Sequence, residues 1–236
     1  MTSRIELSDE RRENRGVHSA EVIMKVRMWL IFVYGSTLFS GCTGFHIGTD
    51  IQAGRQAFLV GNNEAALVYF QSAAQKDPNY VYGTALQQNI WSYVGRAEYA
   101  VGRFSEARSA LQKSLLLEQN NRDIARLYLG LTMARSGDRQ QGVGEIESGM
   151  KGIHEWLEYI TEAHRFSFGQ FWDPRREIRA AIESDLAMLS GKEIEWQKLI
   201  ADGEWVGKRM EEEGDLARRD ERSDLDRDSG GNDGQP

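Results

Sequence analysis

The chain has 236 residues, of which 40% are hydrophobic and 28% charged, enough for one ordinary domain or a short repeat array with tails. Its net charge of -7 argues against a nucleic-acid-binding protein, because binding a polyanion needs a basic face. The chain has only 3 Pro, and its few strand-like runs are not separated by turn residues at short intervals, which argues against an all-β sandwich. The single Cys excludes an internal disulfide framework and a Cys-based zinc site.

The first 42 residues read as a targeting segment. Residues 1–23 are polar and charged and cannot bury enough apolar surface to fold alone. From Met24 a short basic stretch leads into an apolar run over residues 28–39, then into small residues and the only Cys, Cys42. This order is typical of a secretory signal peptide. Because signal peptides begin with the basic stretch, we expect translation to start at Met24 and residues 1–23 to be a misplaced-start extension.

The end of this segment, Leu38–Cys42, resembles the lipobox of bacterial lipoproteins, with Phe39 where Leu is commonest. The resemblance implies that residues 24–41 are cleaved as a lipoprotein signal peptide and that Cys42 is diacylglycerol-modified. An uncleaved transmembrane anchor is one alternative, although the run is short for a spanning helix, which needs about 20 apolar residues. A buried core helix is the other.

Lipidation at Cys42 would place the mature chain in the bacterial cell envelope. Two or more acyl chains anchor a protein stably, whereas one chain binds membranes only marginally. Thr43 stands where an Asp would resemble an inner-membrane retention signal, so the outer membrane facing the periplasm is favoured where that rule applies. Residues 42–48 are then a linker.

Residues 49–152 contain three copies of one pattern of small and large residues. The first copy has Gly54, Gly61, Ala66, Phe70, Ala73 and Pro78; the second has Gly95, Gly102, Ala107, Leu111 and Ser114; the third has Gly130, Gly137, Gly142, Ile146 and Gly149. The pattern resembles the tetratricopeptide repeat. The resemblance implies an all-α fold, a short solenoid of three helical hairpins in which small residues let paired helices approach closely.

Two details of this array stay open at the level of sequence. The extra residues before the second copy, around Val81–Gln87, are expected to extend its first helix. An ordinary helical bundle with accidental glycines is the alternative to the repeat array, but all three copies keep the same spacing between helix glycine and turn glycine.

Beyond the array, residues 153–213 are expected to form a helical cap, because the end of a solenoid must cover its last apolar face. Its helices are predicted over Pro174–Ser190, with Asp173 as N-cap, and over Lys192–Glu213. Residues 214–236 are acidic and poor in apolar residues, which predicts a disordered tail.

An aromatic loop precedes these cap helices. Its members are Phe166, Phe168, Phe171 and Trp172. The first interpretation is that they fill the gap between array and cap; the second is that they form a partner or substrate pocket, since aromatic residues are enriched at binding hot spots.

No motif for catalysis or for a cofactor stands out. There is no nucleotide-binding loop. His154 and His164 would lie about 15 Å apart on one helix, too far to share a metal. No Ser–His–Asp arrangement is visible. We therefore expect a protein that is not an enzyme, with no metal and no cofactor.

In tetratricopeptide arrays the first helix of each hairpin lines a concave groove that binds peptides or protein segments. Transferred to this chain, the resemblance puts the following residues on the groove: Arg55, Asn89, Ser92, Arg96, Tyr99 and Arg135. Arg55 and Arg96 each follow a helix glycine, so they should stack one repeat apart, and with Arg135 they would suit an acidic segment or a chain-end carboxylate. The alternative is that these Arg are merely solvated.

The expected function is a lipid-anchored adaptor or scaffold that binds protein partners of an envelope assembly, for secretion, pili, the outer membrane or polysaccharide export. One alternative is an enzyme-associated or catalytic protein that uses the aromatic loop as a substrate pocket. A third class, a self-associating structural protein, is compatible with the same pattern.

Overall fold

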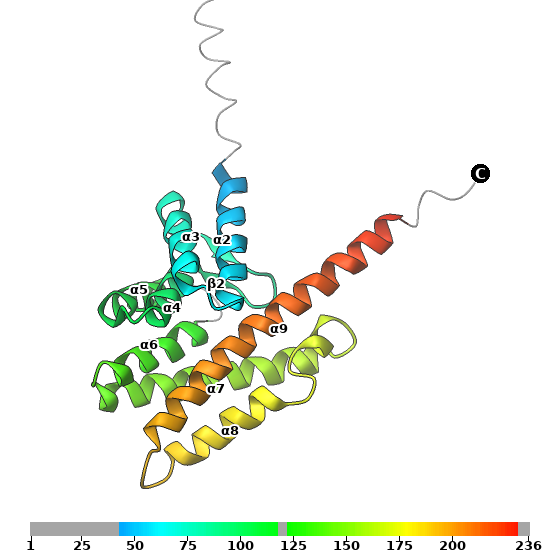
Figure 1. Cartoon of the computed structure of the whole chain (residues 1–236). Coiled ribbons are helices and arrows are strands. Elements are labelled where there is room, and N and C mark those ends of the chain that lie inside the picture. The colour runs from blue at the N-terminus through cyan, green and yellow to red at the C-terminus, as the bar shows by residue number, and fades with distance from the viewer. Residues whose placement is uncertain (1–42, 118–121, 231–236) are drawn as a thin grey trace, which may run out of the picture. The chain divides into compact units, whose positions relative to one another are not determined.

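The computed structural model describes residues 43–117 and 122–230 of the chain (Figure 1). By their internal contacts, residues Ile47–Pro236 form one unit, and Met1–His46 form another, of which only the start of the first helix is described. The described residues are predominantly helical, which confirms the all-α expectation. The helices are α2 (Thr43–Leu59), α3 (Asn63–Lys76), α4 (Ile90–Ala100), α5 (Phe104–Leu116), α6 (Asp123–Arg135), α7 (Arg139–Ala163), η1 (Phe168–Phe171), α8 (Glu177–Leu189) and α9 (Trp196–Gly230).

The same kind of close contact, between a glycine and a large side chain, occurs in each of the consecutive helix pairs α2/α3, α4/α5 and α6/α7. A Cβ atom added to the glycine would lie far inside the normal contact distance of its partner, so the helices could not pack this closely with any larger residue there. The same sequence spacing separates the glycine from its partner each time. Measured from the added Cβ, the nearest side-chain atom of Phe70 is 2.6 Å from Gly54, that of Leu111 is 2.5 Å from Gly95 and that of Ile146 is 2.7 Å from Gly130.

The turns within these pairs also repeat. Gly61, Gly102 and Gly137 have φ angles of 81°, 79° and 98°, a region that glycine enters without the steric cost of a Cβ. At the first turn the N–H of Gly61 donates to Phe58 O at 3.1 Å, and the N–H of the next residue, Asn62, donates to Ala57 O at 2.8 Å. These are the two hydrogen bonds of a Schellman motif, which ends one helix and starts the return.

The connection between the first and second pairs differs from the sequence expectation. Residues around Val81–Gln87 do not extend α4; instead β1 (Val81–Tyr82) pairs antiparallel with β2 (Gln88–Asn89). Gly83 turns the chain with a φ of 111°, and a Cβ there would lie 2.1 Å from Leu86 O. A helix cannot continue through a residue with this φ angle, so the chain forms the two-stranded ribbon of β1 and β2 instead of a longer α4.

The predicted boundary between array and cap at residue 152 falls inside one continuous helix, α7. Its close approach to α6 continues up to that residue, because small residues stand there: a Cβ on Gly149 would lie 2.5 Å from Leu127 N, and one on Gly152 would lie 2.2 Å from the Asp123 side chain. The predicted helix Pro174–Ser190 begins later, at Glu177, since Arg176 has a φ of 57°. Asp173 still caps this helix, its carboxylate accepting the N–H groups of Ile178 and Arg179 at 2.9 and 3.1 Å.

The last helix, α9, packs on α6 and α8 and extends beyond its predicted end at Glu213 to Gly230 (Figure 1). Residues 214–230, which the sequence predicted to belong to a disordered tail, continue the backbone of this helix, and residues 231–236 lie outside the described residues. Asp215 and Ala217 are buried, at 7% and 3% exposed, so contacts with the rest of the unit continue past the predicted boundary.

Candidate functional site

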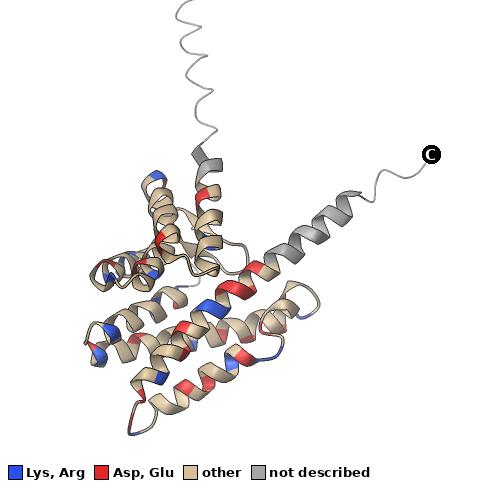
Figure 2. Cartoon of the chain, in the orientation of Figure 1, with Lys and Arg blue, Asp and Glu red and all other residues tan. Residues whose placement is uncertain are grey.

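The groove predicted on the first helices of the three pairs contains a helix of the same chain. Arg55 of α2, Arg96 and Tyr99 of α4, and Arg135 of α6 all contact side chains of α9. Figure 2 shows that α9 carries both signs of charge along its described part. The carboxylates that contact these side chains thus come from the same chain.

Glu211 lies between the two stacked arginines. Its Oε1 accepts a hydrogen bond from Arg55 Nε, and its Oε2 accepts one from Arg96 Nη1 at 3.0 Å. The side chains of Arg55, Arg96 and Glu211 are only 1%, 0% and 2% exposed. The interpretation of Arg55 and Arg96 as exposed contacts for an outside partner is corrected accordingly.

Burial alone would lower the pKa of both guanidinium groups, since it penalises the charged form. The negative charge of Glu211, its hydrogen bonds and the neighbouring tyrosine side chains together outweigh that penalty and raise the pKa of Arg55 and of Arg96 above the ordinary value. Both therefore stay charged at any pH at which the protein folds. Removing one partner of such a buried pair strands the other charge, at a typical cost of about 3–5 kcal/mol.

A second polar contact fixes α9 about two turns before Glu211. Glu204 Oε1 accepts a hydrogen bond from the Tyr99 hydroxyl, and Arg135 Nη2 donates to the same oxygen at 2.6 Å. Arg135 Nε also donates to the Tyr99 oxygen at 2.8 Å. Burial and the neighbouring carboxylate raise the pKa of Tyr99, so the phenol keeps the proton that it donates.

Glycines on α9 let it sit this deep. A Cβ on Gly207 would lie 2.4 Å from the Tyr128 ring of α6, and one on Gly203 would lie 3.0 Å from the side chain of Leu131. Leu199, Val206 and Met210 are buried beside them. The sequence held this signal, two glycines one turn apart among acidic residues, but the signal does not say which surface receives the helix.

The described hydrogen bonds of the remaining predicted groove residues, Asn89 and Ser92, are made to α4, to β2 and to the end of α5. The Asn89 side chain caps α4 by accepting the Ser92 N–H at 3.1 Å, and it donates to Ser114 O at 3.0 Å. The Ser92 hydroxyl donates to Gln88 at 3.1 Å. Both residues are buried and hold the start of α4 in place.

A pocket of about 540 Å³ remains open beside α9, at the turn end of the first two helix pairs. Its lining combines four aromatic side chains with aliphatic, amide and charged ones. It is lined by Phe58, Leu59, Val60, Gly61, Asn63, Tyr99, Ala100, Gly102, Phe104, Tyr128, Arg135, Glu204, Lys208 and Glu211. Of the predicted groove residues, Tyr99 and Arg135 contribute to it.

The aromatic loop does not gather into a pocket of its own among the described residues. Trp172 is buried, 2% exposed, and packs edge-to-face on Trp156 with ring centres 4.7 Å apart. Phe168 stacks on His164 at 4.4 Å, and both it and Phe171 pack on the core, whereas Phe166 is 87% exposed. Three of the four aromatics thus fill the junction between α7 and the cap.

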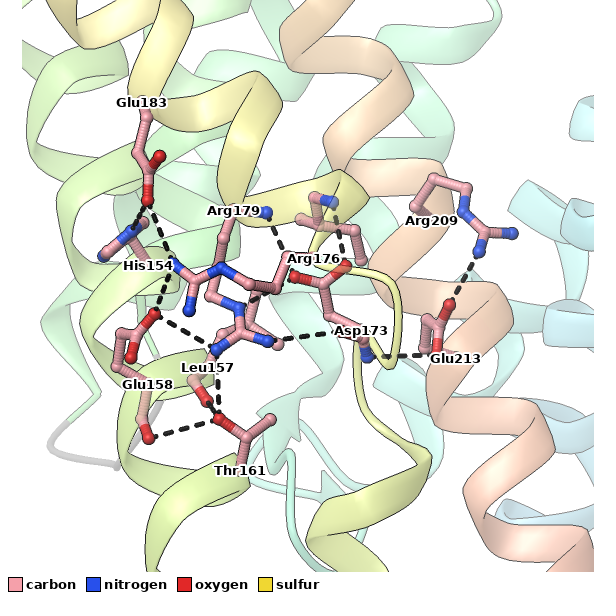
Figure 3. Close-up of polar contacts among 11 residues, drawn as sticks. His154, Leu157, Glu158, Thr161, Asp173, Arg176, Arg179, Glu183, Arg209 and Glu213 are labelled. Carbon is pink, nitrogen blue, oxygen red and sulfur yellow. Dashed lines mark hydrogen bonds and ion pairs between the residues drawn. The ribbon is translucent and has the colours of Figure 1, made fainter. Parts of the chain in front are cut away.

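Polar side chains converge next to this loop, around Asp173 (Figure 3). Arg179 Nε donates to the Asp173 carboxylate at 2.9 Å, and its Nη1 donates to Glu158 and Thr161 at 3.1 Å each. On the other side Glu213 accepts the Asp173 N–H at 3.3 Å. The cluster joins α7, α8 and α9, and its members satisfy one another, which is the arrangement of a structural clamp.

Metal and membrane features are absent from the described ranges. No group of three His, Cys, Asp or Glu side chains there could hold a metal ion. His154 pairs with Glu183 at 2.9 Å. No helix among residues 43–117 and 122–230 has the length and apolar character needed to cross a bilayer. Residues 24–41 and Cys42 lie outside the described residues.

Comparison with protein families, with curated proteins and with solved structures finds no match for this chain.

Proposed function

We propose that this chain is a non-enzymatic adaptor, a lipid-anchored protein of the bacterial cell envelope built from tetratricopeptide-type hairpins, which binds segments of partner proteins. The observation that carries the proposal is the threefold recurrence of one glycine-to-large-residue contact together with one positive-φ glycine turn. Arrays of this kind build stable surfaces from stacked units.

The surface offered to partners is the pocket beside α9. The arginine pair of the groove is occupied by Glu211, and three aromatics of the loop are packed, so neither supplies an open binding surface. The pocket instead is open and combines aromatic and aliphatic side chains with charged ones, so it can contact both apolar and polar groups of a partner. Val60, at 78% exposed, extends its apolar rim.

Photo-crosslinking in the native envelope tests the adaptor role. A photoreactive amino acid at Val60 should capture partner proteins, whereas the same amino acid at Val68 should not. Val68 is a matched control, since it is an exposed valine of the same helix pair, 65% exposed, and is not among the pocket residues. Identical captured proteins at both positions, or none at either, would contradict the proposal.

The anchor has its own test. Mass spectrometry of the membrane-extracted protein should find Cys42 as a lipid-bearing first residue, and Cys42→Ala should release the protein from the membrane fraction. An intact segment 1–41 on the mature protein would exclude the lipoprotein assignment without touching the adaptor role.

A further inference from the structure

The pocket beside α9 is lined by several aromatic rings, and some of the ring faces are already occupied. Arg96 lies over the rings of Phe58 and Tyr128, with its Cζ atom 5.2 Å from each ring centre. Arg135 lies over Tyr99 at 5.6 Å. A cationic ligand would have to compete with guanidinium groups already held by these rings. An uncharged apolar group that packs against the remaining ring surface meets no such competition.

The edge of the pocket offers one acceptor and one donor from the same helix. Both described hydrogen bonds of Glu204 fall on Oε1, and Glu204 is about one-third exposed, which leaves Oε2 for a ligand. Lys208 lies one turn further along α9, where side chains four residues apart are neighbours. Its side chain is 65% exposed, and its described ion pair, with Glu212, is a long 3.7 Å.

A carboxylate acceptor and an exposed ammonium donor, one helical turn apart beside aromatic rings, match the chemistry of a peptide backbone. An extended residue presents one N–H and one C=O, while its side chain projects away from them. We infer that the pocket binds a large apolar side chain of an uncharged, extended polypeptide segment, with the backbone N–H at Glu204 and a carbonyl at Lys208. This inference rests on the proposed adaptor function, of which it specifies the ligand.

The volume is consistent with such an occupant. Pockets for small ligands measure about 300–1,000 Å³, and the 540 Å³ present here has room for one large side chain and the backbone that carries it. The contact would be weak for a single residue and would gain affinity from neighbouring residues of the partner.

Four small probes test this chemistry on the full-length chain. They are N-acetyl-phenylalanine methylamide, its alanine counterpart, the free acid N-acetyl-phenylalanine and the free amine phenylalanine methylamide. Titrations are followed by the methyl resonances of labelled Leu and Val, with Leu59 as reporter and Val68 as reference. The neutral phenylalanine probe should bind and shift Leu59, the alanine probe should not, and both charged probes should bind more weakly than the neutral one.

Variants locate the contact. Lys208→Met and Glu204→Gln should each reduce the affinity for the neutral phenylalanine probe about two- to tenfold, which is the effect of losing one exposed charged contact. Lys151→Met is the matched control for the lysine, because Lys151 is also exposed and paired with a Glu four residues away, and it should change nothing. Val60→Asp should abolish binding.

Each outcome decides one of the two proposals. Stronger binding of the free acid would assign an anionic ligand and overturn the inference, as would equal binding of the alanine and phenylalanine probes or unchanged affinity in Lys208→Met. Capture of partners at Val60 with no probe binding would leave the adaptor role standing and sink the inference. Probe binding without any captured partner would do the reverse.

Discussion

Replacing Glu211 by Leu should destabilise the protein far more than the same change one residue later. Glu211→Leu leaves the guanidinium groups of Arg55 and Arg96 buried, at 1% and 0% exposed, without their shared carboxylate. Breaking a buried pair from one side costs about 3–5 kcal/mol. That is a large part of a typical total stability of about 5–15 kcal/mol. For a protein of this size we expect the melting temperature to fall by roughly 6–20 °C.

Glu212→Leu is the matched control. Glu212 lies on the same helix, is 30% exposed and pairs with Lys208 and Arg209, and partly exposed pairs contribute about 0–1 kcal/mol. A triple variant, Arg55→Met/Arg96→Met/Glu211→Leu, should recover most of the loss, because a buried ionic cluster can be replaced by apolar residues of similar volume. Chemical denaturation of the four proteins gives the free energies of unfolding. A cost for Glu211→Leu no larger than that of Glu212→Leu would refute the claim that a stranded pair of charges governs this site.

Two further predictions concern the packing and the pH dependence. Gly95→Ala should lower the free energy of unfolding by about 1–3 kcal/mol, because the added Cβ would lie 2.5 Å from the Leu111 side chain. Gly144→Ala should instead stabilise its helix by about 0.5–1 kcal/mol, because nothing lies within 4 Å of the added Cβ. Thermal unfolding measures both effects, and equal effects would contradict the close-contact argument. Burial, together with the nearby Asp202 carboxylate, raises the pKa of Asp185 to about 6, so the folded state holds an extra proton and the free energy of unfolding should fall as pH rises from about 4 to about 6. Asp185→Asn should flatten that fall, and an unchanged pH profile would show that Asp185 does not contribute to it.

The sequence predicted the features whose causes are local. The glycines at 54, 95 and 130 and their large partners lie within one hairpin each, so spacing alone revealed them. The residues on the inner face of the first helices were carried over from the resemblance to tetratricopeptide repeats, and Arg55, Arg96, Tyr99 and Arg135 do contact another helix, α9. Patterns of this range need no knowledge of the rest of the fold.

The features that escaped prediction depend on distant partners or on competing turns. Glu211 is 156 positions from Arg55, and no local pattern says that the two will meet. Residues 214–230 look like a solvated tail by composition, yet their backbone continues a helix that is already held by its packed first half. Around Gly83 a positive φ angle diverts the chain into a ribbon, although the composition alone allowed a longer helix.

The most direct test of the central claim, that α9 of the same chain fills the groove of the first helices, is a nuclear Overhauser measurement between Gly207 and Tyr128. A Cβ on Gly207 would lie 2.4 Å from the Tyr128 ring, so the Gly207 Hα protons must be close to the ring protons. In full-length protein with selectively labelled Gly and Tyr, the account predicts a strong cross-peak within one chain. Absence of the cross-peak, or its appearance only between differently labelled chains in a mixed sample, would contradict it.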